Sequence, residues 1–346
     1  MNWSILILGF ALVAGAAALA IGAVRSVLLR HAVLDHPNER SSHSVPTPRG
    51  GGIGLLAIAL PAWVAIGLSV PASLAGPAIT GWAVAAGALF LALVSWIDDL
   101  RSLGAAIRLI VQFVAAAALV LFLPGPVFQG LLPFHADAVA AAILWVWFVN
   151  LYNFMDGIDG IAAVETIAIG LGLALVGLTT VPQVADHLQA GIVAAAALGF
   201  LAWNRPPAKI FLGDVGSVPL GYLLGWLLLG LAATGQWQAA LILPLYYLAD
   251  ATLTLARRAV RREKIWRAHR EHFYQQATQA GRSHAAVAGA IAGVNALLVG
   301  LALAAAHAGS KGPGGWLSLA AAVLLVAALL FWLARAPRPV STDDAS

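Results

Sequence analysis

The sequence contains no cysteine among its 346 residues. This absence excludes disulfide bonds, thiolate metal ligands and cysteine nucleophiles. Charged residues are also scarce, because Asp, Glu, Lys and Arg make up only 10% of the chain, against about a quarter in a typical soluble domain. So few charges cannot cover the surface of a soluble protein of this length, and lipid must replace water around much of the chain. The composition therefore predicts an integral membrane protein.

The sequence also lacks an extramembrane domain, an internal repeat and a low-complexity tract. The net charge of +4 therefore does not indicate nucleic acid as a partner, because no polar domain is present to hold it. We expect residues 1–346 to form a single transmembrane domain, with a disordered cytoplasmic tail at 335–346. No basic residue precedes the first apolar run at 3–24, and Arg25 follows it, so we expect an uncleaved first helix with its N-terminus outside.

Apolar stretches recur along the whole chain, and a spanning helix requires about 20 mostly apolar residues. We predict an all-α fold, a polytopic integral membrane bundle of about 10 to 11 transmembrane helices. The predicted spans are 3–24, 51–70, 77–97, 105–123, 138–155, 160–178, 189–203, 218–234, 238–256, 285–307 and 316–334. The stretch at 189–203 is short, which is compatible with a tilted or partly re-entrant segment.

Alternation of these spans places one set of loops on the same side of the membrane. The loops of this set are 25–50, 98–104, 156–159, 204–217 and 257–284, joined by the C-terminal tail. They and their adjacent helix ends hold every Lys and Arg except Lys311. Because cytoplasmic loops carry the excess of basic residues, we expect this side to be cytoplasmic.

The first of these loops contains Arg40, His43 and Arg49, followed by the glycines 50–52. Arg and His side chains can bind phosphate, and Gly permits close approach of backbone to a ligand. The same residues also fit a Pro-rich turn whose basic side chains only follow the topology. This loop alone leaves both interpretations open.

Paired carboxylates, Asp98 and Asp99, end the third predicted span. Two carboxylates beside apolar Trp96 and Ile97 are costly without a partner, and a divalent cation or a substrate proton would explain them. Adjacent residues of a helix point about 100° apart, so the two side chains can take different roles, such as metal ligand and base. The alternative is an exposed helix C-terminus, where the helix dipole disfavours carboxylates.

A stripe of polar residues ends the fifth predicted span. Asn150, Asn153 and Asp156 recur every three residues, so a helix places them along one face. Asp159 extends the row if the helix continues. Amide and carboxylate oxygens on one stripe suit a hard cation, a hydrogen-bonded sugar or a nucleotide. Hydrogen bonding between helices by Asn is the alternative, but it does not require both aspartates.

Two further loops carry candidate binding residues. Asp214 lies between glycines just before a predicted helix, which suits a metal ligand with backbone donors for phosphate nearby. A helix start capped by Ser217 fits the same residues, and Lys209 of this loop is a candidate for substrate binding. The last large loop contains His269, Arg270 and His272, whose spacing allows the histidines to face one ligand. Because the other candidate ligands are carboxylates, the sequence favours Mg²⁺ or Mn²⁺ over zinc.

Two carboxylates fall inside predicted spans instead of in loops. Asp250 is a candidate functional residue because a carboxylate within the membrane is costly, and Glu165 is a weaker candidate of the same kind. The remaining basic residues of the last loop fit topology and attraction to anionic lipid.

These motifs, in this order, resemble the polyprenyl-phosphate N-acetylhexosamine-1-phosphate transferases, of the glycosyltransferase family 4 type. The resemblance covers about residues 30 to 280 and rests on the segments 46–52, 98–99, 150–160, 211–217 and 269–275. It implies a magnesium-dependent phosphoglycosyl transferase of the bacterial inner (plasma) membrane with a cytoplasmic active site. Such an enzyme moves a sugar-1-phosphate from a UDP-N-acetyl sugar to undecaprenyl phosphate and releases UMP. A homodimer is an assembly we also consider.

The resemblance also implies roles for individual residues. Asp98, Asp99, Asp156 and Asp159 match the family's catalytic carboxylates, and Asp214 its magnesium ligand, with Asp99 beside it. Residues expected to bind substrate are Arg40, His43, Arg49, Asn150, Asn153, Lys209, His269, Arg270 and His272.

The branch of the family and the mechanism stay open. Muramoyl-pentapeptide transferases carry a run of adjacent histidines in the last loop, whereas here Arg270 lies between two spaced ones. This difference favours the branch that begins lipid-linked O-antigen-like surface polysaccharides, with GlcNAc, QuiNAc or FucNAc as the donor sugar. A cell-wall muramoyl-pentapeptide transferase is one alternative, and a transporter of an anionic or lipid-linked solute is another. We favour direct attack by the lipid phosphate over a covalent aspartyl-phosphate.

Overall fold

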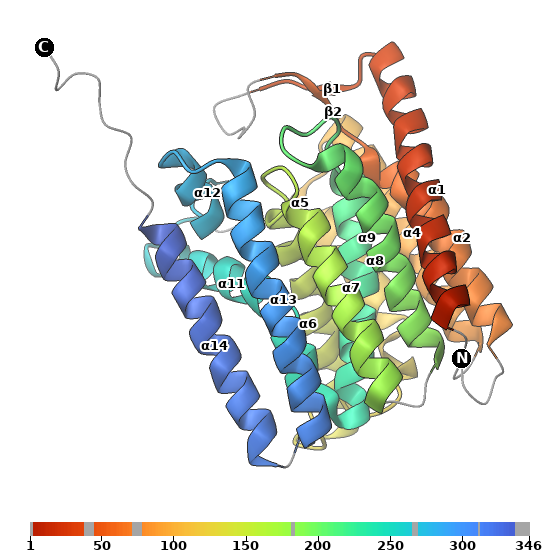
Figure 1. The fold of residues 1–346 in the computed structure, drawn as a ribbon, viewed down its shortest axis with the longest axis vertical. Helices are drawn as coiled ribbons and strands as arrows, with labels where there is room; N and C mark the ends of the chain where they lie inside the picture. The colour runs from red at the N-terminus through yellow and green to blue at the C-terminus, as the bar shows by residue number, and fades with distance from the viewer. Residues whose placement is uncertain are drawn as a thin grey trace, which may run out of the picture.

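The computed structural model describes residues 3–37, 45–70, 78–180, 184–264, 269–310 and 312–335. Over these residues the protein is a helical bundle (Figure 1), which confirms the predicted all-α membrane fold. The strands described are β1 (Leu34–Asp35) and β2 (Thr47–Pro48), which pair antiparallel. Long helices are expected here because each satisfies its own backbone hydrogen bonds within lipid.

The helices of the bundle differ in length but most are close to the thickness of a membrane. They are α1 (Trp3–Arg30), α2 (Gly51–Ser69), α4 (Ala78–Arg101), α5 (Ala105–Ala117), α6 (Phe134–Phe154), α7 (Ile161–Thr180), α8 (Val184–Asn204), α9 (Asp214–Leu231), α10 (Trp237–Ile242), α11 (Leu245–Val260), α12 (Phe273–Gln279), α13 (His284–Ala308) and α14 (Pro313–Ala334). A 3₁₀ turn, η1 (Val120–Phe122), follows α5, and a π turn, η2 (Ala232–Gln236), joins α9 to α10.

Among the described residues, 10 helices are long and apolar enough to span a membrane. The prediction for 238–256 is wrong in one respect, because this stretch is divided between α10 and α11. Pro244 lies at the break, and a proline has no N–H for the helical ladder. The expectation of a re-entrant segment at 189–203 is also wrong, since α8 runs unbroken from Val184 to Asn204.

The chain nevertheless crosses the bundle between α9 and α12. Gly235 adopts a φ of 95°, where the chain reverses direction. Just beyond it, Gln238 donates to the Ser310 carbonyl at one end of the bundle. Asp250 accepts hydrogen bonds from the backbone of Phe273 and Tyr274 at the other end. α10 and α11 together therefore lead the chain from one end to the other, although neither is a complete span.

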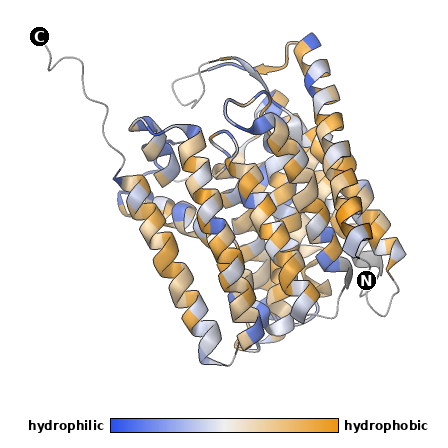
Figure 2. Ribbon diagram, viewed as in Figure 1, coloured by the Kyte–Doolittle hydropathy of each residue, from blue (hydrophilic) through white to orange (hydrophobic). Residues whose placement is uncertain are grey.

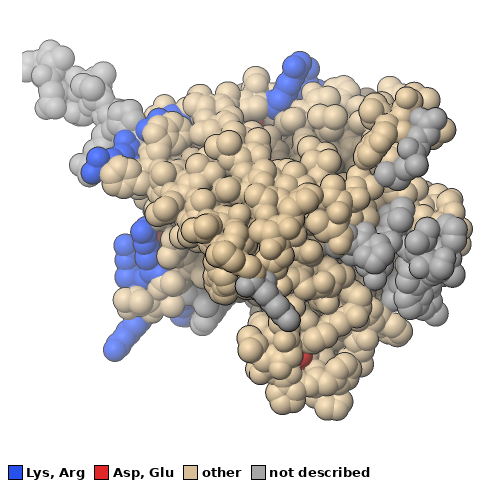
Figure 3. All heavy atoms as spheres, turned by 60° about the horizontal axis from the view of Figure 1, so that its bottom comes forward, with Lys and Arg blue, Asp and Glu red and all other residues tan. Residues whose placement is uncertain are grey.

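The loops predicted to share a side lie at one end of the bundle, which we call the polar end. It holds β1, β2, α12 and the loops that follow α4, α6 and α8, and it is the upper end of Figure 1. Figure 2 shows hydrophilic residues concentrated there, with hydrophobic residues along the helices below. Figure 3 turns the opposite end forward, and most of the surface visible there carries no charge.

The predicted tail falls mostly on residues 336–346, which lie outside the described part of the chain.

α9 lies at the centre of the bundle, and every residue from Val215 to Leu231 is buried. Small residues allow neighbouring helices to approach it closely. A Cβ atom on Gly52 would lie 2.2 Å from the Cα of Gly216, so the start of α2 packs directly on the start of α9. This contact places the first and fourth polar loops side by side.

Candidate active site

An arginine and two aspartates from three separate polar loops meet at the polar end. The Nη2 atom of Arg49 lies 2.6 Å from Asp214 Oδ1 and 2.9 Å from Asp99 Oδ1. The Asp99 side chain is 8% exposed and that of Asp214 is 18% exposed, whereas Arg49 keeps 38%. Two nearly buried carboxylates thus share one partly exposed cation, and the structure brings together three residues that the sequence analysis assigned to different roles.

The backbone around Arg49 holds this arrangement in place. Arg49 forms a parallel bridge with Phe211, and the amides of Gly51 and Gly52 donate to the Phe211 and Leu212 carbonyls at 2.8 and 2.9 Å. Gly50, with a φ of 136°, supplies a backbone conformation that other residues rarely adopt. The expectation that these glycines admit a ligand is therefore wrong, because their N–H groups and their space are used to pack α2 against the Asp214 loop.

The paired aspartates point to different partners, as predicted for adjacent residues of a helix. Asp98 accepts hydrogen bonds from the amide of Leu103 at 2.5 Å and from Arg108 Nη1 at 3.1 Å. Asp99 faces Arg49 and the amide of Val215, which lies 3.4 Å from its Oδ2. Each carboxylate therefore has a cation of its own, one from α5 and one from the first polar loop.

The first two members of the predicted stripe, Asn150 and Asn153, lie on α6 at the cavity. Asn153 Oδ1 accepts a hydrogen bond from Ser217 Oγ at 2.5 Å, and Asn150 donates to Gln112 Oε1 at 2.6 Å. Asp156 follows the end of α6 and is only partly exposed. Burial raises the pKa of its carboxyl to about 7, opposed by the nearby Arg49 and reinforced by Asp214. Asp156 therefore lies near enough to Arg49 and Asp214 for their charges to act on it.

Asp159 does not continue this row, and that prediction is wrong. α6 ends at Phe154 and Gly160 turns the chain with a φ of 83°. The Asp159 carboxylate accepts a hydrogen bond from the amide of Ala208 at 3.0 Å and lies 3.3 Å from His284 Nδ1. It ties the loops before α7, α9 and α13 together instead of facing Arg49.

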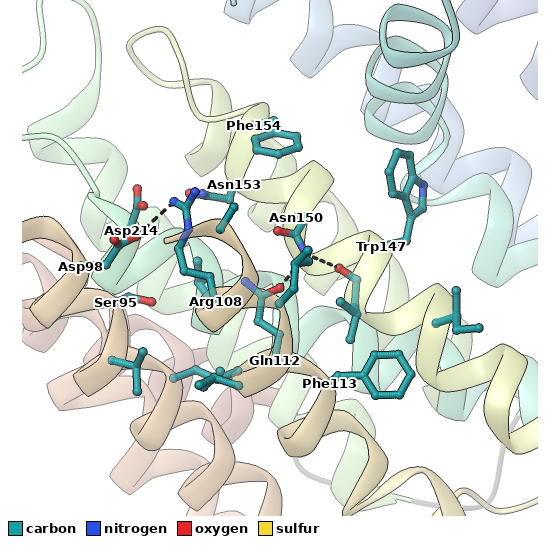
Figure 4. Close-up of a pocket in the computed structure, with 18 of the residues that line it drawn as sticks. Ser95, Asp98, Arg108, Gln112, Phe113, Trp147, Asn150, Asn153, Phe154 and Asp214 are labelled. Carbon is teal, nitrogen blue, oxygen red and sulfur yellow. Dashed lines mark hydrogen bonds and ion pairs between the residues drawn. The ribbon is translucent and has the colours of Figure 1, made fainter. Parts of the chain in front are cut away.

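An apolar cavity of about 390 Å³ opens beside the carboxylates (Figure 4). Its wall consists mostly of apolar side chains of α4, α5 and α6, among them Leu91, Leu109, Phe113, Ile143, Val146 and Trp147. Polar residues gather toward one end, and these are Ser95, Asp98, Arg108, Gln112, Asn150, Asn153 and Asp214. Figure 4 shows Arg108 reaching from α5 toward Asp98 and Asp214.

Sequence reasoning missed Arg108 and Gln112, which supply the polar side chains of α5 at this cavity. A signal for them existed. They lie four residues apart, so a helix places them on one face, and polar residues inside a span are costly unless they have a function.

The last loop is held more deeply than predicted. His272 is 2% exposed, with its Nδ1 atom 3.2 Å from the Oδ1 atom of Asp250. The His269 ring lies 4.9 Å from that of His272, and burial, with help from nearby His272 and Arg258, lowers the His269 pKa to about 4. Arg270 is half-buried in the same loop. Asp250 lies on α11, whereas His269, Arg270 and His272 lie in the loop before α12. None of the contacts described for Asp250, His269 and His272 joins them directly to Arg49.

The other predicted binding residues are placed differently. Lys209 is exposed, and its Nζ atom lies 5.9 Å from the centre of the Trp203 ring, which Arg25 also covers. Arg40 and His43 lie outside the described residues.

The carboxylates at Arg49 suit magnesium by their chemistry. Within the described ranges, no three His, Asp or Glu side chains are placed to hold a metal ion together. Mg²⁺ does not require such a cage, because it usually binds one or two carboxylates and takes its other ligands from water and substrate phosphates. Asp99 and Asp214, which share Arg49, supply such a pair of oxygen ligands.

Comparison with known proteins assigns this arrangement to a family. The family model described as glycosyl transferase family 4 matches residues 81–232. This segment includes the paired aspartates, the α6 stripe and Asp214.

Three relatives show how far the similarity extends. A probable undecaprenyl-phosphate N-acetylglucosaminyl 1-phosphate transferase of Bacillus subtilis is 28% identical over 282 residues, which cover 75% of this chain and 74% of that protein. A decaprenyl-phosphate N-acetylglucosaminephosphotransferase of Mycolicibacterium smegmatis is 34% identical, with 60% of this chain and 55% of that protein covered. A phospho-N-acetylmuramoyl-pentapeptide-transferase of a Mycobacterium species (strain JLS) is 32% identical over 60% of this chain and 68% of that protein. The chain thus spans little more than half of the second relative and about two thirds or more of the other two, and it belongs to glycosyl transferase family 4.

Proposed function

We propose that this protein transfers a sugar-1-phosphate from a UDP-N-acetylhexosamine to undecaprenyl phosphate and releases UMP. The observation that carries the proposal is that Asp214, which pairs with Arg49 beside Asp99, also lines the polar end of the apolar cavity. A transferase of this kind must bring a water-soluble nucleotide sugar to a phosphate whose chain stays in the bilayer. A charged cluster at one end of a membrane cavity meets both requirements.

The cavity is suited to the lipid substrate. Its wall along α4, α5 and α6 is almost entirely apolar, so it can bury isoprenoid units at a gain of roughly 25 cal/mol per Å². Arg108 lies at the polar end with 39% of its side chain exposed, and its partner there is Asp98. We assign the lipid phosphate to this end, with Arg108 as the cation that binds it.

The reaction then needs no covalent intermediate. An oxygen of the lipid phosphate attacks the β-phosphorus of the UDP-sugar, and a new P–O bond forms as the bond from that phosphorus to the bridging oxygen of UMP breaks. The catalytic requirement is positioning and neutralisation of charge. Asp99 and Asp214 are both paired with Arg49, and Asp98 with Arg108. These pairings favour direct attack over an aspartyl-phosphate on Asp98, Asp99 or Asp214, because these three carboxylates are already paired with arginines.

Magnesium completes the proposed site, with Asp214 and Asp99 as the ligands of this chain. When bound, the ion would supply positive charge to the diphosphate. Arg49 holds the two carboxylates close together, and Asn153 with Ser217 positions α6 beside them. We place this end of the bundle in the cytoplasm because the basic residues gather there, in a bacterial inner membrane.

The donor sugar is assigned as N-acetylglucosamine or a close analogue. Relatives named for N-acetylglucosamine and for the muramoyl-pentapeptide both match the chain. The spaced histidines 269 and 272 favour the first group and a role in beginning a surface polysaccharide. The transporter alternative loses support, because the charged cavity residues lie at one end of the bundle and not at its middle.

A panel assay tests the proposal. Membranes containing the protein are incubated with Mg²⁺, undecaprenyl phosphate and one of UDP-GlcNAc, UDP-QuiNAc, UDP-FucNAc or UDP-MurNAc-pentapeptide. We expect release of UMP and a lipid product whose mass equals undecaprenyl diphosphate plus the N-acetyl sugar. Product only from the MurNAc donor would move the protein to the cell-wall branch, and no product from any donor would contradict the proposal.

A further inference from the structure

Asp250 is a carboxylate inside the bundle that the proposed reaction does not use. Its side chain is fully buried in α11, and a buried carboxylate is costly unless its hydrogen bonds are satisfied. Its polar contacts converge from two directions. Tyr246 and Thr254 donate to it from its own helix, at 3.2 and 3.3 Å. The remaining donors come from the last polar loop.

Three consecutive residues of that loop are bound by this one carboxylate. The amides of Phe273 and Tyr274 donate to it at 3.0 and 3.3 Å, and His272 Nδ1 lies 3.2 Å away. The first turn of α12 is therefore fixed to α11.

Tyr274 connects the start of α12 to the end of α6. Its hydroxyl donates to the Phe154 carbonyl at 3.1 Å. A Cβ atom on Gly157 would lie 2.2 Å from the same hydroxyl. The Tyr274 hydroxyl therefore contacts the chain on both sides of Asp156, at Phe154 and at Gly157. The phenol ring is fully buried and stacks on His272, with ring centres 5.7 Å apart. The ring therefore has little freedom to move independently of the loop.

These contacts form one continuous path from α11 to the site. We propose that Asp250 and Tyr274 are positioning residues, which lock the last polar loop to the turn between Phe154 and Gly157 and so set the place of the Asp156 carboxylate. This inference rests on the proposed function for its kinetic consequence. Neither residue touches Arg49, Asp99 or Asp214 among the described contacts, so the effect passes through Phe154 and Gly157.

The test compares three variants of the full-length protein. Tyr274→Phe keeps the ring and removes the hydroxyl that binds Phe154, and Asp250→Asn removes the charge that holds the loop. Tyr222→Phe is the matched control, because Tyr222 is also buried and donates to a backbone carbonyl, that of Ala115 at 3.3 Å. We expect Tyr274→Phe and Asp250→Asn to lower kcat by about 10- to 100-fold, the range for a misplaced catalytic group, with KM for UDP-GlcNAc changed less than about twofold.

The double variant provides a second readout. If both residues act through one path, Tyr274→Phe with Asp250→Asn loses little more kcat than the worse single variant. A merely structural role predicts that kcat, KM and thermal stability change together, and that Tyr222→Phe behaves like Tyr274→Phe. Either result would overturn the inference.

Hydrogen exchange separates this inference from the proposed function. Peptides that cover residues 150–160 should exchange faster in Tyr274→Phe and Asp250→Asn than in wild type or Tyr222→Phe. Unchanged exchange in that segment contradicts the coupling, whatever the activity. If wild type forms no product with any donor, the proposed function fails, while the exchange data still decide whether the last loop holds the Asp156 turn.

Discussion

Arg49 Nη2 lies 2.6 Å from Asp214 Oδ1, although the two residues are 165 positions apart in the sequence. The contact joins the first polar loop to the start of α9, and Asp99 completes it from α4. Removing the arginine would leave two nearly buried carboxylates facing each other without a cation, which is strongly unfavourable.

We therefore expect Arg49→Ala to lower kcat by about 100-fold or more, the usual scale for loss of a charge that stabilises a transition state. Arg49→Lys should recover part of the rate, because it restores the charge but not the planar guanidinium whose Nη2 atom contacts both carboxylates. Arg335→Ala, an exposed arginine over Phe331 at the end of α14, is the matched control. Equal activity of Arg49→Ala and Arg335→Ala would remove Arg49 from the site.

Magnesium dependence is tested most directly at Asp214. Asp214→Asn keeps the size of the side chain but weakens a hard-cation ligand. We expect the activity of wild type to disappear with EDTA and return with Mg²⁺, and Asp214→Asn to require a higher Mg²⁺ concentration for half-maximal rate. Full activity of Asp214→Asn at the wild-type Mg²⁺ requirement would contradict the metal assignment. Asp137→Asn is a control, because Asp137 is buried at the opposite end, where it accepts from the Val127 and Phe128 amides.

Arg108 gives a prediction that concerns the lipid substrate alone. Because Arg108 lies at the polar end of the apolar cavity, Arg108→Ala should raise KM for undecaprenyl phosphate about tenfold, the equivalent of one charge-assisted hydrogen bond. KM for the UDP-sugar should change much less. The measurement is steady-state UMP release with one substrate varied at a time, and a larger rise for the UDP-sugar would assign Arg108 to the nucleotide instead.

The sequence predicted the positions of site residues correctly where the geometry of a single helix determines them. Asn150 and Asn153 were identified because a period of three already places them on one face of α6. Asp156 and Asp159 lie beyond Phe154, where the helix ends, so helical geometry does not decide their positions. The partners of Asp159, Ala208 and His284, are far away in sequence.

Contacts between loops could not be predicted from the sequence for the same reason. Nothing local indicates that Gly52 would meet Gly216, or that Asp250 would bind the start of α12. Both depend on how α9 and α11 pack within the bundle. The prediction of the number of spans was limited in a similar way, because Pro244 breaks a stretch whose composition is apolar enough for a single helix.

The contact between Gly52 and Gly216 predicts a large effect from a small substitution. A Cβ atom on Gly52 would lie 2.2 Å from the Gly216 Cα, and backbone cannot move aside as a flexible side chain can. We expect Gly52→Ala to destabilise the protein by about 1–3 kcal/mol, with loss of activity as the Asp214 loop shifts. Gly289→Ala is the matched control, since a Cβ atom on Gly289 of α13 would meet nothing within 4 Å. Thermal unfolding in detergent compares them, and equal midpoints would contradict the tight packing.

The raised pKa of Asp156 predicts how stability depends on pH. Burial raises that pKa from 3.8 to about 7, so between these values the folded state binds more protons than the unfolded state, and its stability falls as pH rises. His269 has the opposite sign, because its pKa is lowered from 6.5 to about 4, so its effect makes stability rise with pH up to about 6.5 and then level off. From about pH 6.5 to 8 His269 therefore no longer changes the stability, and the difference in slope between wild type and Asp156→Asn reports the Asp156 contribution. We expect the unfolding midpoint of wild type to decline over that window and the midpoint of Asp156→Asn to stay flatter. His269→Gln should keep the wild-type slope there, and an identical slope for Asp156→Asn would show that Asp156 is already ionised below pH 6.5.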